Sequence, residues 1–229
     1  MCGRFAFYSP DEAVVRLFDV AEMTDVGSGY NLAPTQLVPV LRANDAGLRR
    51  VDGLRWGLVP FWAKDKAIGN RMINARAETV AEKPAFRQAF RRRRCLVLAN
   101  GFYEWKRLGD KKQPYYVTRE DGEPFAMAGL WESWRDRAAT DPEVVETCTI
   151  ITTTPNPLMA AIHQRMPVIL DPSPVAEWLD PGAAVEALTP LLRPYGGDGF
   201  VAVPVGTSVN NSRNQGAELI EPAGAVIRA

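Results

Sequence analysis

The order of the apolar segments constrains the fold of this chain more than any other feature. Strand-like runs outnumber helix-like runs, and the two kinds do not alternate regularly. Regular β-α alternation is the mark of a doubly wound parallel sheet, so its absence argues against that fold. β-branched and apolar runs indicate strands at residues 38–41, 54–59, 95–99, 115–117, 125–128, 147–153 and 201–205. The sequence therefore predicts an α+β fold with mixed or antiparallel sheets.

Short helices are expected between these strands. Ser9-Pro10-Asp11-Glu12 has the capping-box pattern with proline at the first helical position, which predicts a helix directly after it. Further helices are indicated near Pro84 and at residues 158–162, 175–179 and 185–192. Asp121-Gly122 lies between the strand-like runs 115–117 and 125–128, which is a hairpin signal.

The chain is expected to form a single domain over residues 1–229, with the last few residues as a loose tail. It has no repeats and no low-complexity linker, and 46% hydrophobic residues suffice for a proper core. Lys+Arg and Asp+Glu both number 27, so the net charge is zero. A neutral chain is not a histone-like DNA coat, and any binding of nucleic acid must come from a local basic patch.

Several classes of site and location are disfavoured. No run of about 18 apolar residues exists to span a membrane. The N-terminus lacks a basic segment followed by an apolar one, so it is not a secretory signal. Three widely spaced cysteines form neither a disulfide framework nor a zinc-type pair, and His163 is the sole histidine. We therefore expect a cytoplasmic protein without a metal.

Cys2 stands out because of its position. Methionine aminopeptidase removes Met1 when the next side chain is small, and the mature chain would then begin with a cysteine. Such a residue carries an α-amine and a thiol on one carbon framework. The unperturbed α-amine has a pKa of about 7.7–8.0, so a useful fraction is neutral at pH 7 and attacks aldehydes. The thiol can then close on the imine to form a thiazolidine. The alternative is a frayed terminus without a role.

Glu104 and His163 are the two candidates for proton transfer. Glu104 follows a buried strand and is flanked by aromatic residues, so desolvation would favour its neutral form and suit general acid/base work. The alternative is an exposed glutamate at a strand end. His163 lies in a polar break between apolar segments, and histidine titrates nearest neutral pH. A lone histidine is more often a packed or exposed residue than a catalyst.

Three further features carry polar or stacking groups. If residues 74–78 begin extended, Asn74 and Arg76 point to the same side, where an amide and a guanidinium suit a sugar and a phosphate; the alternative is a capped turn. The run 91–94, four arginines, is better interpreted as a helix C-terminus than as a phosphate site. Trp62 lies beside lysines and could stack on an unpaired base. Cys95 and Cys148 are interpreted as buried structural thiols.

Together and in order, these segments resemble the SRAP family, the SOS response-associated peptidases that process abasic sites. The resemblance runs from residue 1 to about residue 220 and rests on seven motifs: Met1-Cys2-Gly3-Arg4, Tyr30-Asn31-Leu32-Ala33-Pro34-Thr35, Trp56-Gly57-Leu58, Ile73-Asn74-Ala75-Arg76-Ala77-Glu78-Thr79, Gly101-Phe102-Tyr103-Glu104-Trp105, His163-Gln164-Arg165-Met166-Pro167 and Asn214-Gln215-Gly216-Ala217-Glu218-Leu219.

The resemblance implies a single compact domain of barrel-like sheets with flanking helices. It implies a covalent DNA–protein cross-link at abasic sites in single-stranded DNA, made by a monomer that needs no cofactor and associates with the nucleoid when bound to DNA. The implied catalytic residues are Cys2, Asn74, Glu104 and His163. The implied DNA-binding residues are Arg4, Pro34, Trp62, Arg76, Thr152 and Arg165.

Two other functions remain open from the sequence. Cys2 and His163 could form the nucleophile–base pair of a thiol peptidase, an activity that would extend to removal of the protein's own first residue. The chain could also be a single-strand-binding module without chemistry, in which case loss of the Cys2 side chain would not affect DNA retention.

Overall fold

Five strands close into a barrel in the computed structural model, which describes residues 2–44, 46–141, 143–196 and 198–228. In order around the barrel they are β11 (Val144–Thr153), β10 (Phe125–Arg135), β7 (Arg94–Ala99), β4 (Leu37–Ala43) and β5 (Arg49–Trp56). All neighbours are antiparallel except β11 and β5, whose parallel pairing at Cys148 and Trp56 closes the ring. Closure leaves none of the five as a free edge, and buried apolar side chains such as Leu96 and Met127 fill the core.

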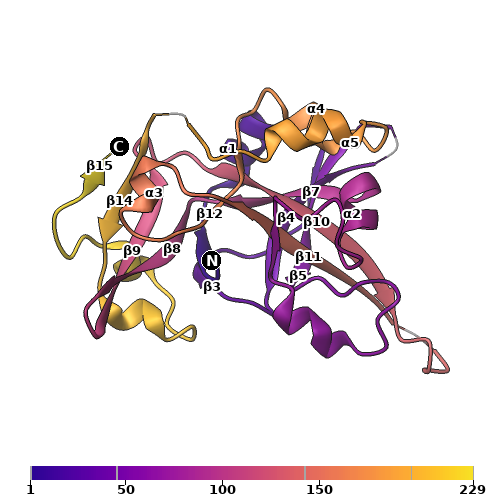
Figure 1. Cartoon of the computed structure of the whole chain (residues 1–229), viewed down its shortest axis with the longest axis horizontal. Coiled ribbons are helices and arrows are strands. Elements are labelled where there is room, and N and C mark those ends of the chain that lie inside the picture. Colours follow the sequence, from indigo (N-terminus) through magenta and orange to yellow (C-terminus); the bar gives the residue numbers. More distant parts are fainter. Residues whose placement is uncertain (1, 45, 142, 197, 229) are drawn as a thin grey trace.

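A second, six-stranded sheet lies beside the barrel (Figure 1). Its order is β15 (Ile227–Arg228), β14 (Phe200–Pro204), β9 (Lys111–Arg119), β8 (Gly101–Leu108), β1 (Phe5–Phe7) and β3 (Gly29–Leu32). Only Asn100 separates the barrel strand β7 from β8. Its side chain accepts hydrogen bonds from the Tyr8 and Ser9 amides at 2.8 and 3.0 Å. Gly101 follows because a Cβ there would stand 2.2 Å from the Tyr116 ring.

Four short strands extend the barrel strands: β2 (Glu22–Met23), β6 (Asn74–Arg76), β12 (Met166–Pro167) and β13 (Ile169–Leu170). Both β6 and β12 pair with the C-terminal half of β11. This end of β11 therefore collects two segments that are distant in the sequence.

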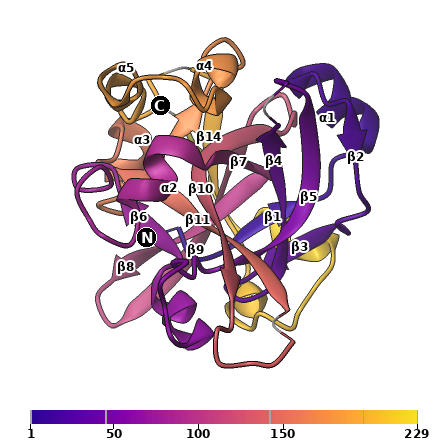
Figure 2. The same ribbon diagram turned by 90° about the vertical axis from the view of Figure 1, so that its right-hand side faces the viewer.

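Short helices lie on the outside of the strands, and Figure 2 shows them apart from one another. They are α1 (Asp11–Phe18), α2 (Arg87–Arg92), α3 (Pro157–Ala160), α4 (Val175–Leu179) and α5 (Val185–Leu188), with 3₁₀ turns at Lys66–Arg71, Thr189–Leu191, Thr207–Asn210 and Ala217–Ile220. None of the helices formed by the described residues is both long and apolar enough to cross a bilayer.

The arginine run ends a helix, which confirms its structural interpretation. Arg94 is buried, and its guanidinium donates to the Phe90 and Arg91 carbonyls of α2 and to the Trp178 carbonyl of α4. Trp178 in turn donates to the carbonyl of Cys95 at 2.8 Å. One cation therefore satisfies the C-terminal carbonyls of α2 and ties α4 to the barrel.

Two sequence predictions were wrong in detail. The strands on either side of Asp121-Gly122 do not pair, because β9 belongs to the second sheet and β10 to the barrel; an Asp-Gly turn marks a chain reversal but does not choose the partner strand. Ser9 does not cap α1, because its hydroxyl accepts from Asn100 instead. Near the C-terminus, Ile227 and Arg228 pair with Ala202 and Val201 of β14.

Asp52 joins two arginines on the barrel surface. Burial would raise the pKa of Asp52, but hydrogen bonds from Arg50 and Arg42 outweigh it and lower that pKa. Asp52→Asn is expected to lower the free energy of unfolding by about 2 kcal/mol at pH 7, because charge-assisted hydrogen bonds are lost. The contribution is present above the ordinary aspartate pKa of about 3.9 and disappears as pH falls through the lower value of the folded state.

Urea unfolding of wild type and Asp52→Asn at pH 7 and pH 3 measures this effect. Asp121→Asn is the matched control, since Asp121 also pairs with an arginine but its side chain is 48% exposed. A loss of about 0.5 kcal/mol or less is expected there. An equal loss in both variants, or a loss for Asp52→Asn that does not shrink at pH 3, would contradict the assignment.

Candidate functional site

The candidate site lies where the N-terminal segment and β8 of the second sheet meet the loop after α3. β1 and β8 pair at Phe5 and Phe102, and the Tyr103 amide donates to the Arg4 carbonyl, so the segment before β1 runs along β8 toward Glu104. From the other side, His163 comes within 3.9 Å of Glu104 (Nε2 to Oε2). The N-terminal segment, β8 and the loop after α3 thus bring together a thiol, a carboxylate and an imidazole.

Cys2 is fully buried at this junction and forms no disulfide. Burial and the neighbouring Glu104 carboxylate raise the pKa of the Cys2 thiol well above its ordinary range, although the backbone amide of Arg4 stabilises the thiolate. The Cys2 thiol therefore stays protonated at neutral pH. Removal of Met1, which the sequence predicts, concerns a residue outside the described part of the chain.

Glu104 is buried, with 2% of its surface exposed, which rejects the alternative of an exposed strand-end glutamate. It lies on β8, inside the second sheet, where it pairs with Tyr115 of β9. The His163 ring accepts a hydrogen bond at Nδ1 from the Arg165 amide at 3.1 Å. The other ring nitrogen, Nε2, faces Glu104.

Arg165 holds the histidine loop against the barrel. Its guanidinium forms a two-pronged ion pair with Glu78, at 2.5 and 3.0 Å, and donates to the Thr152 carbonyl at 2.6 Å. The hydrogen bond from Arg165 lowers the pKa of Glu78. Thr152 is buried on β11 and reaches the site through this contact. Sequence reasoning quoted Glu78 within a motif but gave it no role; its place two residues after Arg76 was the available signal.

Asn74 and Arg76 occupy the short strand β6, which confirms the extended interpretation. Ala75 between them is buried, whereas Arg76 is exposed. The Asn74 amide group donates to the Ile73 carbonyl at 2.9 Å, while its buried Oδ1 accepts no hydrogen bond from the residues that the structure describes. A buried acceptor without a partner in the protein is suited to a donor on a ligand.

The Arg4 side chain forms its hydrogen bonds with other groups of the protein. It donates to the Asn31 side chain at 2.7 Å and to the Val209 carbonyl at 2.8 Å. Asn31 is fully buried and also donates to carbonyls of the 209–214 segment, and Gln215 accepts from the Asn31 amide and donates to its carbonyl. The sequence did not predict that Asn31 and Gln215 contact each other. Both belong to quoted motifs, but no local pattern links the two positions.

Pro34 and Trp62 lie on loops at the ends of barrel strands. Pro34 is half-buried in the turn before β4. The next residue, Thr35, adopts a left-handed backbone with φ 77°, and its amide donates a hydrogen bond to the Trp56 carbonyl. Trp62 is 45% exposed, a large free aromatic surface that is available for stacking.

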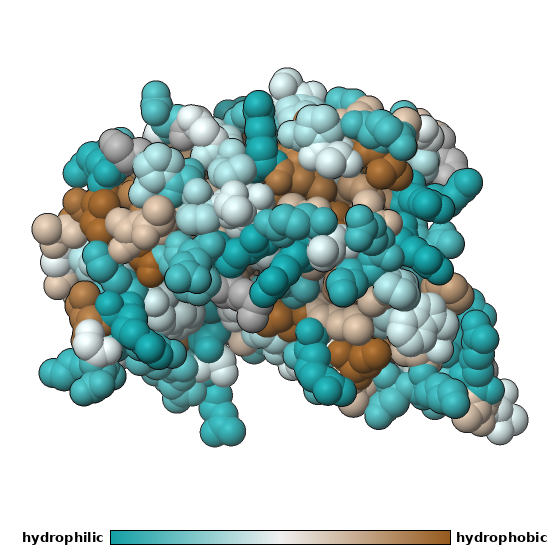
Figure 3. All heavy atoms as spheres, in the orientation of Figure 1, coloured by the Kyte–Doolittle hydropathy of each residue, from teal (hydrophilic) through white to brown (hydrophobic). Residues whose placement is uncertain are grey.

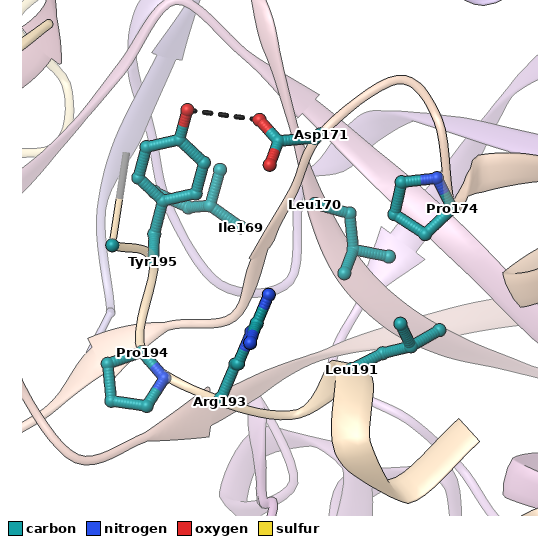
Figure 4. Close-up of a pocket in the computed structure, with 9 residues that line it drawn as sticks. Ile169, Leu170, Asp171, Pro174, Leu191, Arg193, Pro194 and Tyr195 are labelled. Atoms are coloured by element: carbon teal, nitrogen blue, oxygen red, sulfur yellow. Dashed lines mark hydrogen bonds between the residues drawn. The ribbon is translucent and has the colours of Figure 1, made fainter. Parts of the chain in front are cut away.

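A separate cavity of about 350 Å³ lies on the far side of β13 and contains none of the candidate residues. Figure 4 shows Tyr195 and Asp171 on its wall, joined by a hydrogen bond of 3.0 Å. Among the described residues, no group of three or more histidine, cysteine or acidic side chains is arranged to hold a metal ion.

Comparisons with known proteins show the family of this chain. The family model described as "SOS response associated peptidase (SRAP)" matches residues 1–212. Abasic site processing protein YoaM of Bacillus subtilis is 44% identical over 226 residues, which cover 96% of this chain and 98% of that protein. Abasic site processing protein YedK of Escherichia coli is 33% identical and covers 97% and 100% respectively. A crystal structure of a Bacteroides thetaiotaomicron protein superposes with a TM-score of 0.85 at 27% identity, covering 97% of this chain and all of that one.

Proposed function

Because this chain belongs to the SOS response associated peptidase family, we propose that it recognises abasic sites in single-stranded DNA and bonds to them covalently through Cys2. The product is a thiazolidine cross-link that shields the lesion from strand cleavage. One observation carries this proposal: Cys2 is buried against Glu104, which His163 approaches to 3.9 Å from the loop after α3. The names of the relatives supply the substrate.

The reaction begins at the aldehyde carbon C1′ of the ring-opened abasic sugar. The Cys2 α-amine, freed by removal of Met1, adds to this carbon, and loss of water gives an imine. The thiol sulfur then bonds to the same carbon while its proton goes to the imine nitrogen. Glu104 receives and returns protons during ring opening and loss of water, because it is fixed beside the thiol. His163 moves protons at the sugar hydroxyl or the thiol, and the Asn74 Oδ1 accepts a hydrogen bond from the linkage or the sugar.

The protonation of the thiol fits this order of events. Burial and Glu104 raise the pKa of Cys2, so the thiol keeps the proton that the imine nitrogen needs at ring closure. An open imine would permit β-elimination and break the strand. The saturated thiazolidine has no iminium, so ring closure protects the DNA.

The same property of Cys2 weighs against a thiol peptidase as the main activity. A catalytic cysteine needs a lowered pKa to supply thiolate, whereas here the pKa is raised. A binding module without chemistry leaves no role for a buried thiol, carboxylate and imidazole gathered from distant segments. Specificity would rest on backbone contacts and on stacking by Trp62, since an abasic site has no base edge to read.

The test is a denaturing gel of the purified protein mixed with single-stranded DNA that carries one abasic site. We expect a band shifted by the mass of the protein, and an intact mass of the free protein that lacks Met1. The band is expected only with the abasic strand and not with an undamaged strand of the same length. Absence of a shifted band from protein that has lost Met1 would overturn the proposal.

A further inference from the structure

The hairpin formed by β8 and β9 carries four cations beyond the candidate site. The strands continue past Trp105 and turn at Gly109 and Asp110. The cations are Lys106, Arg107, Lys111 and Lys112. Within the described part of the chain, none of the four forms an ion pair, and the single acid of the turn is Asp110. The hairpin projects at the lower left of Figure 1, and hydrophilic side chains gather at this corner in the matching view of Figure 3.

The cross-strand register places like charges against each other. Arg107 lies directly opposite Lys112, and such pairs destabilise a hairpin. Neither Arg107 nor Lys112 forms an ion pair with a carboxylate of the described residues. An arrangement that costs folding stability and leaves its cations without partners is suited to an external polyanion.

The register also divides the cations between two faces. Glu104, Lys106 and Leu108 alternate along one face of β8, and Lys111 lies opposite Leu108 on that same face. Arg107 and Lys112 lie on the other face. With a rise of roughly 3.3 Å per residue, Lys106 is about 7 Å and Leu108 about 13 Å along the strand from Glu104. The Glu104 face therefore leads from the site directly onto two lysines and onto Leu108, which is 53% exposed.

We propose that Lys106, Leu108 and Lys111, here called the basic track, bind the sugar–phosphate backbone of single-stranded DNA on one side of the lesion. The inference rests on the proposed function. It adds a second region of contact with DNA, outside the residues that surround Cys2. The lysines contact phosphates, and Leu108 packs on a sugar or base. The hairpin extends the DNA-binding surface by the length of its two strands.

Two double variants test the track within one hairpin. Lys106→Ala/Lys111→Ala removes two charges from the Glu104 face, and Arg107→Ala/Lys112→Ala removes two charges from the opposite face. Affinity is measured against salt concentration with single-stranded DNA that carries a tetrahydrofuran abasic analogue, which has no aldehyde and so binds reversibly. We expect the first variant to bind about tenfold more weakly at low salt. Its slope of log affinity against log salt should fall by about 1.4, the value for two phosphate contacts on a single strand.

The opposite-face variant is expected to change the salt slope by less than about 0.5, because its charges act only at a distance. Equal changes in the two variants, or none in the first, would overturn the basic track. Thermal unfolding of each variant checks that the hairpin is intact; Arg107→Ala/Lys112→Ala is expected to be slightly more stable, because the like-charge pair is removed.

A cross-linking assay separates this inference from the proposed function. Wild type is reacted with strands that carry a true abasic site in the middle or next to either end. A strand that ends before it reaches the hairpin is expected to cross-link at saturating protein. The tetrahydrofuran form of the same strand is expected to bind wild type and the Lys106→Ala/Lys111→Ala variant with equal affinity. No cross-link with any strand would overturn the proposed function. Normal cross-linking with unchanged salt slopes would overturn the basic track alone.

Discussion

Replacement of Cys2 by alanine is expected to abolish the cross-link that survives denaturation. Alanine is also small, so Met1 is still removed and the α-amine is still exposed. The variant can form an imine with the abasic aldehyde but cannot close the thiazolidine ring. The imine hydrolyses on the gel, and part of it undergoes β-elimination, so cleaved DNA should replace the shifted band.

Borohydride distinguishes the roles of the amine and the thiol in this variant. It reduces an imine to a stable amine, so the shifted band should return with Cys2→Ala when the reductant is present. Wild type should need no reductant. A stable adduct from Cys2→Ala without borohydride would show that the thiol is dispensable, and no adduct with borohydride would show that the α-amine is not the attacking group.

Glu104→Gln is expected to slow cross-linking by about 100-fold or more, with little change in affinity for the tetrahydrofuran strand. Glutamine keeps the shape of the side chain but cannot accept and return a proton, and a positioned acid/base contributes roughly 10²–10⁴ in rate. Glu132→Gln is the matched control, because Glu132 is also buried, at 3% exposure against 2%, but pairs with Arg93 on the barrel. That control is expected to lose stability without a comparable loss of rate.

The same Glu104→Gln substitution is expected to increase, not decrease, the rate at which Cys2 is alkylated. The Glu104 carboxylate raises the pKa of the Cys2 thiol, so its removal lowers that pKa and increases the thiolate fraction. Alkylation of Cys2 by iodoacetamide at pH 8 should therefore be faster in Glu104→Gln than in wild type. Faster alkylation combined with slower cross-linking identifies proton transfer as the lost function. A parallel decrease in both rates would instead point to a disturbed site.

Local sequence patterns predicted where strands occur better than they predicted which strands pair. The β-branched run that became β11 and the apolar run that became β7 were predicted, because burial on both faces leaves a clear signal in the sequence. The pairing of β11 with β5, which closes the barrel, joins residues about ninety positions apart, and nothing local encodes it. The wrong hairpin at Asp121-Gly122 has the same cause, because strand pairing is decided by tertiary packing.

The candidate site was predicted as a set of residue types, and the geometry refined their roles. Cys2, Glu104 and His163 come together as expected. Arg4 and Arg165, both expected on DNA, already bind groups of the protein. Sequence patterns identify a guanidinium but not its partner, because Asn31 and Glu78 are 27 and 87 residues away from their respective arginines. Their DNA contacts stay predictions.

The one-residue connection at Asn100 has a consequence for how this architecture tolerates change in length. β7 belongs to the closed barrel, and Glu104 lies only five positions after its last residue. Side chains alternate between faces, so one residue inserted or deleted between Ala99 and Glu104 would turn the carboxylate away from Cys2. No strand crosses the described segments 57–73 and 136–141, so a change of length there does not alter this alternation. Insertions in chains of this architecture should therefore accumulate in those segments, while the spacing from the barrel to the carboxylate stays invariant.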